Sequence, residues 1–145
     1  MTRTAIEEAL TRQKDAFARR DIEALTALHA PEGTFQSPAY NLVTGRDSIR
    51  EIYRYWYAAF PDFILTWDSA LIDPPHASYI WTFDGTAAGP FFGDVKVGSK
   101  VSMIGATEAT FGPEGIIAIR HVFDFSGTLM RTGAVSYTHL TLPTN

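Results

Sequence analysis

The N-terminal part of the chain places apolar side chains at helical intervals. Ile6, Leu10 and Phe17 recur with the spacing of one helix face, which predicts a helix at the N-terminus. Asp21 is a typical N-cap residue for a second, short helix, which Pro31 is expected to close. Two helices are therefore expected to open the fold.

The stretch TGRDSIREIYRYWYAAFPDF carries the strongest helical pattern. Thr44 and Asp47 have capping-box spacing, and Pro61 marks the end of the helix. Between these limits the apolar positions form one broad aromatic face, made of Ile49, Ile52, Tyr53, Trp56, Tyr57 and Phe60. This pattern predicts a third helix that packs its aromatic side on the core.

From residue 63 onward the pattern changes to that of strands. Strand-like runs cover residues 63–72, 77–88, 100–111 and 116–125, separated by DPPH, GPFFGDVKVGS and the hairpin signal GPEG. Helices followed by consecutive strands predict an α+β fold in which helices cover an antiparallel sheet. The sequence has no internal repeat and no linker, so we expect one domain.

Composition narrows the classes of protein that fit this pattern. With 145 residues, 46% of them hydrophobic, the chain can bury one full core. The net charge of -4 comes without a basic stripe, so we expect no nucleic-acid partner. The chain has no cysteine and no stretch that resembles a signal peptide or a membrane span. We therefore expect a cytoplasmic protein without membrane contact.

Histidines stand singly along the chain, and no phosphate-binding loop, dinucleotide motif or hydrolase motif occurs. His121 and Asp124 lie three residues apart on a predicted strand, where their side chains would point to opposite faces. We therefore expect no metal site.

Asp124 is the carboxylate of greatest chemical interest. It lies in the apolar run IIAIRHVFDF, where burial of an unpaired polar group costs roughly 2 to 7 kcal/mol. Such burial would raise the pKa of the carboxyl group toward the range useful for acid-base catalysis. In the alternative, structural interpretation, Asp124 lies at the end of the strand and bonds the turn at Ser126 and Gly127. The residues alone leave both interpretations open.

Arg120 shares the predicted strand face of Asp124. It could hold that carboxylate ionised or bind an anionic group, although an ordinary cross-strand ion pair is the interpretation we favour. Several aromatic residues could line a cavity for a flat hydrophobic ligand, although most of them are expected in the core: Trp56, Phe60, Trp67, Trp81, Phe91 and Phe92.

The order of these elements and four local stretches resemble the SnoaL-like polyketide cyclases, a family within the nuclear transport factor 2-like superfamily. The stretches are FARRDIEALTALHAPEGTFQSP, GRDSIREIYRYWYAAFPDF, WTFDGTAAGPFFG and GPEGIIAIRHVFDFSGTLMRTG. The resemblance covers nearly all of residues 4 to 133. Each stretch alone is moderately specific, and their order and spacing carry the assignment.

The resemblance implies a cone, in which a curved antiparallel sheet and three helices enclose an apolar pocket. It also implies a homodimer formed through the sheet, and an intramolecular aldol closure without a metal or organic cofactor. The acid-base residue implied is the aspartate of the final strand, here Asp124. The substrate is then a hydrophobic, carbonyl-bearing small molecule, and our pocket candidates are Trp56, Phe60, Trp81, Thr107 and Arg120.

Three positions depart from the family pattern. Thr107 and Ala87 stand where many members carry histidine, and Arg131 stands where the tail usually has glutamine. Glu108 would replace a missing helper only if a bulge turned it inward. These losses keep open a second interpretation, in which the protein is a non-catalytic small-molecule binder or a dimeric scaffold of the same fold.

Residues 134–145, AVSYTHLTLPTN, alternate like an added edge strand. The same residues can be back-translated into a transposase adapter used in preparing DNA sequencing libraries. We therefore interpret residues 1–133 as the SnoaL-like domain and residues 134–145 as an artefactual tail. We expect the tail to be disordered or loosely packed, and we exclude it from the functional argument.

Overall fold

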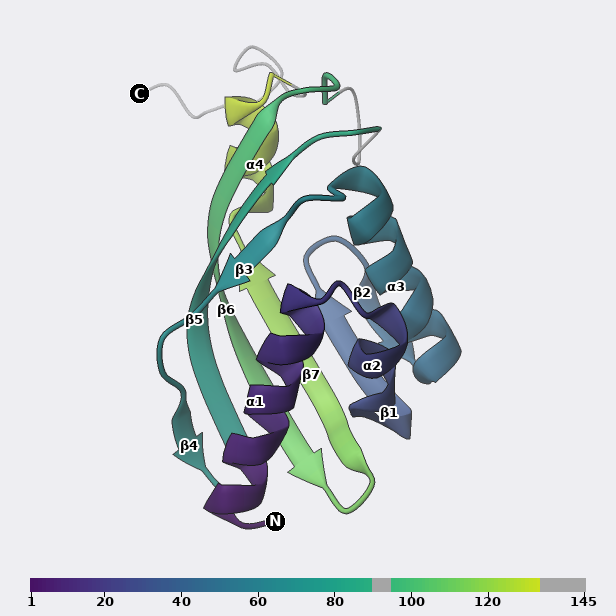
Figure 1. Cartoon of the computed structure of the whole chain (residues 1–145), viewed down its shortest axis with the longest axis vertical. Coiled ribbons are helices and arrows are strands. Elements are labelled where there is room, and N and C mark those ends of the chain that lie inside the picture. The colour runs from purple at the N-terminus through teal and green to yellow at the C-terminus, as the bar shows by residue number, and fades with distance from the viewer. Residues whose placement is uncertain (90–94, 134–145) are drawn as a thin grey trace, which may run out of the picture.

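The computed structural model describes residues 1–89 and 95–133. Three helices from the first half of the chain cover one face of a strongly curved sheet, and a short fourth helix follows the last strand (Figure 1). The predicted α+β fold is therefore confirmed. Two of the predicted features lie outside the described residues: the tail at residues 134–145, and Phe91 and Phe92.

Helices α1 (Arg3–Ala18), α2 (Ile22–Ala27) and α3 (Arg46–Ala59) match the three predicted helices. The predicted cap of α2 is confirmed, because the Asp21 side chain accepts a hydrogen bond from the Ala24 amide. The predicted capping box of α3 is wrong: Gly45 is the N-cap residue and no side chain caps the helix. The close of the second helix was also misplaced, since α2 ends at Ala27 and Pro31 lies in the following strand.

The strands form one seven-stranded sheet with the path β2-β1-β7-β6-β5-β3, and β4 pairs with β5. Their bounds are β1 (His29–Ser37), β2 (Asn41–Thr44), β3 (Ile64–Thr66), β4 (Leu71–Asp73), β5 (His76–Thr86), β6 (Lys100–Gly112) and β7 (Gly115–Phe123). The sheet is mixed and mostly antiparallel, because β1 runs parallel to β7. The long chain between β1 and β7 permits this parallel pairing, which strand periodicity does not reveal.

Two predicted strands end differently in the structure. The run at residues 63–72 divides into β3 and β4, which both pair with β5 at different places. The last strand stops at Phe123, because Asp124 caps helix α4 (Phe125–Arg131) instead of continuing the strand. The hairpin predicted at GPEG is confirmed between β6 and β7.

Odd-numbered residues of β5 and β6, and of β7 from Ile119 onward, point into the cone, whereas a register shift near the start of β7 turns Ile116 inward and Ile117 outward. On β5 the inward-pointing residues are Tyr79, Trp81 and Phe83, which are buried, whereas Ile80 between them is exposed. The same alternation continues on β6 and β7, and the cross-strand register sets Tyr79, Thr107 and His121 in one row. The next row contains Trp81, Gly105 and Phe123. These two rows position the site.

Gly105 leaves open the space that the indole of Trp81 occupies. A Cβ atom at position 105 would collide with the Cζ2, Cη2 and Cε2 atoms of Trp81, so the ring lies across β6 where a side chain would otherwise stand. The ring is almost completely buried in this position. A methyl group here would force the indole out of its contacts.

Gly105→Ala is therefore expected to lower the free energy of unfolding by about 1–3 kcal/mol. Urea denaturation followed by tryptophan fluorescence measures this change. Gly89→Ala is the matched control, because a Cβ atom at position 89 meets nothing within 4 Å, and its effect should stay within about 0.5 kcal/mol. Equal stabilities of the two variants would contradict the packing role of Gly105.

Candidate functional site

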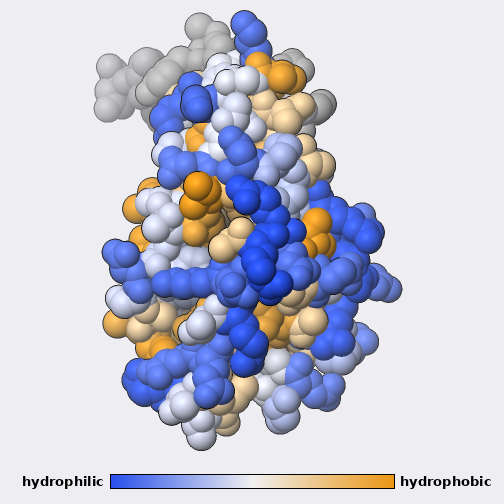
Figure 2. Space-filling view, in the orientation of Figure 1, coloured by the Kyte–Doolittle hydropathy of each residue, from blue (hydrophilic) through white to orange (hydrophobic). Residues whose placement is uncertain are grey.

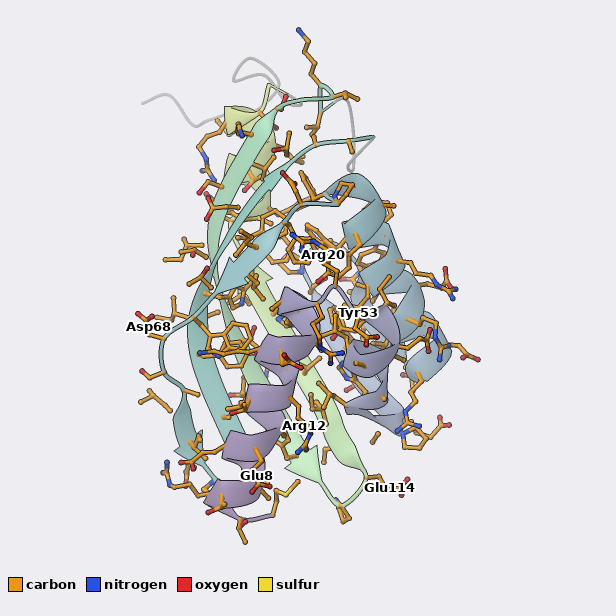
Figure 3. The ribbon with its side chains drawn as sticks, in the orientation of Figure 1. Glu8, Arg12, Arg20, Tyr53, Asp68 and Glu114 are labelled. Carbon is orange, nitrogen blue, oxygen red and sulfur yellow. The ribbon has the colours of Figure 1, made fainter. Side chains whose placement is uncertain are left out.

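An apolar cavity of about 80 Å³ lies between the helices and the inner face of the sheet. Its wall consists of side chains from α1, α3 and the strands: Phe17, Phe35, Ser37, Ile52, Tyr53, Trp56, Phe63, Leu65, Trp81, Phe83, Met103, His121 and Phe123. None of these described lining residues is Asp, Glu, Lys or Arg. Figure 3 labels Tyr53, which α3 contributes to the interior. Among the described residues His121 is the single imidazole in the wall.

A short chain of hydrogen bonds connects His121 to Thr107 and Trp81 on the neighbouring strands. The Trp81 indole Nε1–H donates to Thr107 Oγ1 at 2.8 Å, and Thr107 Oγ1 lies 2.6 Å from His121 Nδ1. The register explains this chain, because Thr107 stands directly opposite His121, and Trp81 reaches Thr107 across Gly105. The chain joins the three central strands through their side chains.

The hydrogen bond between Thr107 and His121 is compatible with two tautomers of the ring. An indole can only donate, so Trp81 occupies one of the two lone pairs of Thr107 Oγ1. The hydroxyl proton of Thr107 can go to His121 Nδ1 or to the hydroxyl oxygen of Tyr79, whose side chain also hydrogen-bonds Thr107. If Thr107 donates to Nδ1, the ring proton of a neutral His121 resides on Nε2; if Nδ1–H donates to the second lone pair of Thr107, Nε2 is an acceptor.

Nε2 of His121 has no hydrogen-bond partner among the described residues. In residues 1–89 and 95–133, His29 Nδ1 is the only side-chain nitrogen or oxygen that is both inaccessible to solvent and without a hydrogen-bond partner. Because His121 Nε2 is also without a partner, it must be partly accessible. Burial, together with the charge of a protonated His29, lowers the pKa of His121 to about 3. His121 is therefore a neutral imidazole at pH 7 in the wall of an apolar cavity.

A second imidazole lies deeper in the same region. His29 is fully buried, its Nε2 lies 2.9 Å from the Tyr53 hydroxyl, and burial lowers its pKa to about 4. The Phe35 ring stands between the two histidines, with its centroid 4.8 Å from the centroid of His121 and 6.4 Å from that of His29. Both imidazoles are thus held uncharged by their apolar surroundings.

Asp124 does not have the burial that a raised pKa requires. It is exposed at the N-cap of α4, where Oδ1 accepts from the Gly127 amide at 3.0 Å and Oδ2 accepts from Arg131 at 3.0 Å. The hydrogen bond from Arg131, and next that from Gly127, lower the pKa of Asp124. The pKa shift is thus opposite to the one that burial would cause, and the contact with the turn at Gly127 matches the structural interpretation.

The residues that the sequence predicted for the pocket lie in three different places in the structure. Trp56 and Trp81 line the cavity, whereas Phe60 is fully buried beside it and does not line it. Thr107 lies behind His121 and is absent from the cavity wall. Arg120 lies on the outer face, 66% exposed and 3.9 Å from Glu108 on β6, which is the cross-strand pair that we favoured.

Sequence reasoning missed His121, Phe35, Ser37 and Tyr53 as lining residues. For His121 a signal was available: alternation on β7 sets residues 119, 121 and 123 on one face and places Arg120 and Val122 on the other. Choosing the face that carries Ile119 and Phe123 as the buried one would have identified His121. No group of three potential metal ligands occurs within the described ranges.

The two depressed histidine pKa values predict how stability depends on pH. Below the ordinary histidine pKa of 6.5 the unfolded chain protonates its histidines, whereas folded His29 and His121 stay neutral down to a pKa of about 4 and about 3. The unfolded state then binds more protons than the folded state. As the pH falls, the free energy of unfolding therefore decreases by up to about 1.4 kcal/mol per pH unit for each histidine.

Urea denaturation at a series of pH values between about 7 and about 4 measures this slope. His29→Gln and His121→Gln should each reduce it, because each removes one group that titrates differently in the two states. His76→Gln is the control, since His76 is exposed on β5, and the wild-type slope should persist. An unchanged slope in the first two variants would contradict the neutral, buried histidines.

Comparisons with known proteins agree with this architecture. The family model described as SnoaL-like polyketide cyclase matches residues 7–131, and no curated protein matches the sequence. TsrD from Streptomyces laurentii has 21% identity and a TM-score of 0.79, with 93% of this chain and 99% of that chain covered. AclR from Streptomyces galilaeus has 21% identity and a TM-score of 0.79, with 92% and 84% covered.

A third similar structure contains a small molecule. It is a protein from Catenulispora acidiphila with a ketosteroid isomerase-like fold, in complex with trimethylamine, at 21% identity and a TM-score of 0.74, with 88% of this chain and 94% of that chain covered. At these identities the solved structures establish the fold. No described helix is both long and apolar enough to cross a membrane. Because the family model spans most of the domain, the chain belongs to the SnoaL-like polyketide cyclase family.

Proposed function

We propose that this protein is an acid-base catalyst that acts on a hydrophobic, carbonyl-bearing small molecule, and that His121 is the polar group that meets the substrate. The observation that carries the proposal is the chain Trp81–Thr107–His121, which holds a neutral imidazole in the wall of the apolar cavity. In the proposed tautomer the ring proton of His121 is on Nε2. A neutral imidazole can polarise a carbonyl group, as a known pattern of enzyme catalysis. The aromatic wall would hold the flat body of the ligand.

The chemistry follows from the donor. A substrate carbonyl oxygen accepts a hydrogen bond from Nε2–H, so negative charge that develops on this oxygen is stabilised. A solvent water molecule then takes a proton from the neighbouring carbon, the electron pair of the C–H bond moves into an enolate, and the enolate carbon attacks a second carbonyl carbon. The hydronium ion returns its proton to the alkoxide formed there, so the aldol closure leaves the protein and the water unchanged.

Asp124 is the alternative candidate for proton transfer. Its capped, ionised carboxylate would act as a base only if the substrate reaches the junction of β7 and α4, next to Phe123 in the cavity wall. Its lowered pKa makes it a weaker base than a buried carboxylate, because base strength falls with pKa. The roles of His121 and Asp124 can be separated by a reaction that needs no knowledge of the natural substrate.

Exchange of the α-protons of 2-tetralone in D₂O, followed by proton NMR, measures enolate formation at a flat hydrophobic ketone. The wild-type protein is expected to accelerate this exchange over buffer. His121→Phe should reduce the acceleration roughly 100-fold, as removal of a donor to a developing oxyanion does. Thr107→Val should also reduce it, because the orientation and tautomer of His121 are no longer fixed.

Asp124→Asn serves as the matched comparison, and its exchange rate is expected to equal that of the wild type. The amide can still accept a hydrogen bond at the N-cap, so α4 should persist. Loss of exchange in Asp124→Asn together with full exchange in His121→Phe would overturn the role of His121 and assign the acid-base role to Asp124.

A second candidate function is binding without catalysis. Two observations favour it: the cavity is small and largely aromatic, and a protein of similar fold was crystallised with trimethylamine. Aromatic faces attract ammonium groups by cation–π interaction. Trimethylammonium that binds this protein, with no acceleration of 2-tetralone exchange, would favour the binder over the enzyme.

A homodimer is the second part of the proposal. The outer face of the central strands carries a row of side chains from Ile80, Ala106 and Val122, in which Ile80 is 66% and Val122 61% exposed. The oppositely charged Glu108 and Arg120 stand beside this row. A face that carries apolar residues and both charges can pair with its own copy around a two-fold axis.

Val122→Asp is expected to convert this dimer to monomers, because it would bury two like charges near the two-fold axis. Sedimentation velocity measures the change in mass. Val97→Asp is the control, since Val97 is similarly exposed (65%) but lies outside the sheet face, and it should leave the dimer intact. A wild-type protein that sediments as a monomer would refute the dimer.

A further inference from the structure

A second hollow lies beside the inner cavity, between α1 and β3. This groove has a volume of about 410 Å³ and an apolar floor made by Phe17, Phe63, Leu65 and Trp67. Two basic side chains, Lys14 and Arg20, stand along it. Figure 2 shows hydrophobic surface where β3 passes the C-terminal end of α1, with hydrophilic surface next to it. The groove is therefore amphipathic, with apolar walls and a cationic border.

The groove and the inner cavity share part of their walls. Phe17, Phe63 and Leu65 line both, so a single layer of side chains separates the two spaces. Phe17 and Leu65 in this layer are only partly buried. Phe17 meets the rings of Tyr53 and Trp67 edge-on, with centroids 6.1 and 6.2 Å apart. Rotation of one such side chain would join the two spaces.

The volumes of the two spaces indicate that a substrate would occupy both of them. The inner cavity holds about 80 Å³, whereas a benzene-binding cavity in a protein measures roughly 150 Å³. A molecule large enough to undergo ring closure therefore cannot fit in the inner cavity alone. Pockets for such molecules usually measure about 300–1,000 Å³. The groove of about 410 Å³ adjoins the cavity along three lining residues and supplies this room.

Lys14 and Arg20 have no carboxylate partner in the described part of the chain. The Lys14 Nζ atom lies 5.0 Å from the centre of the Trp67 ring and donates to the Asp68 carbonyl oxygen at 3.4 Å. Arg20 donates to the carbonyl oxygens of Pro61 and Asp62, at 2.9 and 3.3 Å. Among the described residues both positive charges thus meet carbonyl oxygens and, for Lys14, an aromatic face, and both side chains line the groove.

We propose that the groove between α1 and β3 binds the anionic end of an amphipathic substrate, whose apolar carbonyl-bearing part enters the inner cavity. This inference rests on the proposed function and adds a carboxylate or phosphate group to the substrate class. The anion lies between Lys14 and Arg20, and the chain that connects it to the reacting carbonyl lies over Phe17, Phe63 and Leu65. Lys14 and Arg20 select the substrate and take no part in the reaction.

Isothermal titration calorimetry with three probes tests the proposal: 2-naphthoate, 2-naphthyl phosphate and the uncharged methyl 2-naphthoate. The wild-type protein is expected to bind at least one of the anions about fivefold more tightly than the ester, as a pair of partly solvated charges allows. Raising the salt concentration to about 0.5 M should remove most of this difference. The tighter of the two anions tells whether the substrate carries a carboxylate or a phosphate.

Lys14→Gln is the decisive variant, because Lys14 is exposed on a helix and its loss leaves the fold intact, whereas Arg20 also anchors the chain after α3. It should reduce the preference for the anion, with Arg20 still present, and leave binding of the ester unchanged. Arg12→Gln removes the same charge from α1, at a position that does not line the groove, and should keep the preference (Figure 3).

Equal binding of the ester and both anions, or an unchanged preference in Lys14→Gln, would overturn the proposal. In that case, binding of the ester that is weakened by His121→Phe would still support the proposed function. If no probe binds the wild-type protein, the groove proposal fails, and the exchange of 2-tetralone by itself decides the proposed function. The two claims are therefore distinguishable.

Discussion

The packing of Trp81 across the bare backbone of Gly105 is the contact on which the interior of the cone depends. The indole fills the space above β6 and turns its N–H toward Thr107. Thr107 Oγ1 in turn lies 2.6 Å from His121 Nδ1, and the proposed function requires the ring proton of His121 on Nε2. The absence of a side chain at position 105 thus permits the hydrogen-bond chain that reaches His121 on β7.

Burial then keeps His121 uncharged. The two histidines lie on either side of Phe35, and their lowered pKa values keep the interior free of positive charge at pH 7. None of the described residues that line the cavity brings a full charge into it. Charged side chains stand outside it, for example at the rim between α1 and β3 and on the outer face of the sheet. A ligand that satisfies both environments is apolar in the middle and polar at its ends.

The sequence allowed prediction of the helices and the fold class, because helical spacing and strand alternation are local properties. It predicted neither the parallel pairing of β1 with β7 nor the division of residues 63–72, since both depend on contacts between distant segments. For the site, Trp56 and Trp81 were identified from their size and position. Thr107 was noticed only as a departure from a family pattern, and its bond to His121 follows from the register of β6 and β7.

The most direct test of this account is the protonation state of His121 in solution. Heteronuclear NMR of the histidine ring nitrogens distinguishes a nitrogen that carries a proton from one that does not. We predict that His121 has a protonated Nε2 and an unprotonated Nδ1, with no titration between about pH 5 and about pH 8, unlike an exposed histidine. A proton on Nδ1, or titration near the ordinary histidine pKa, would contradict the account.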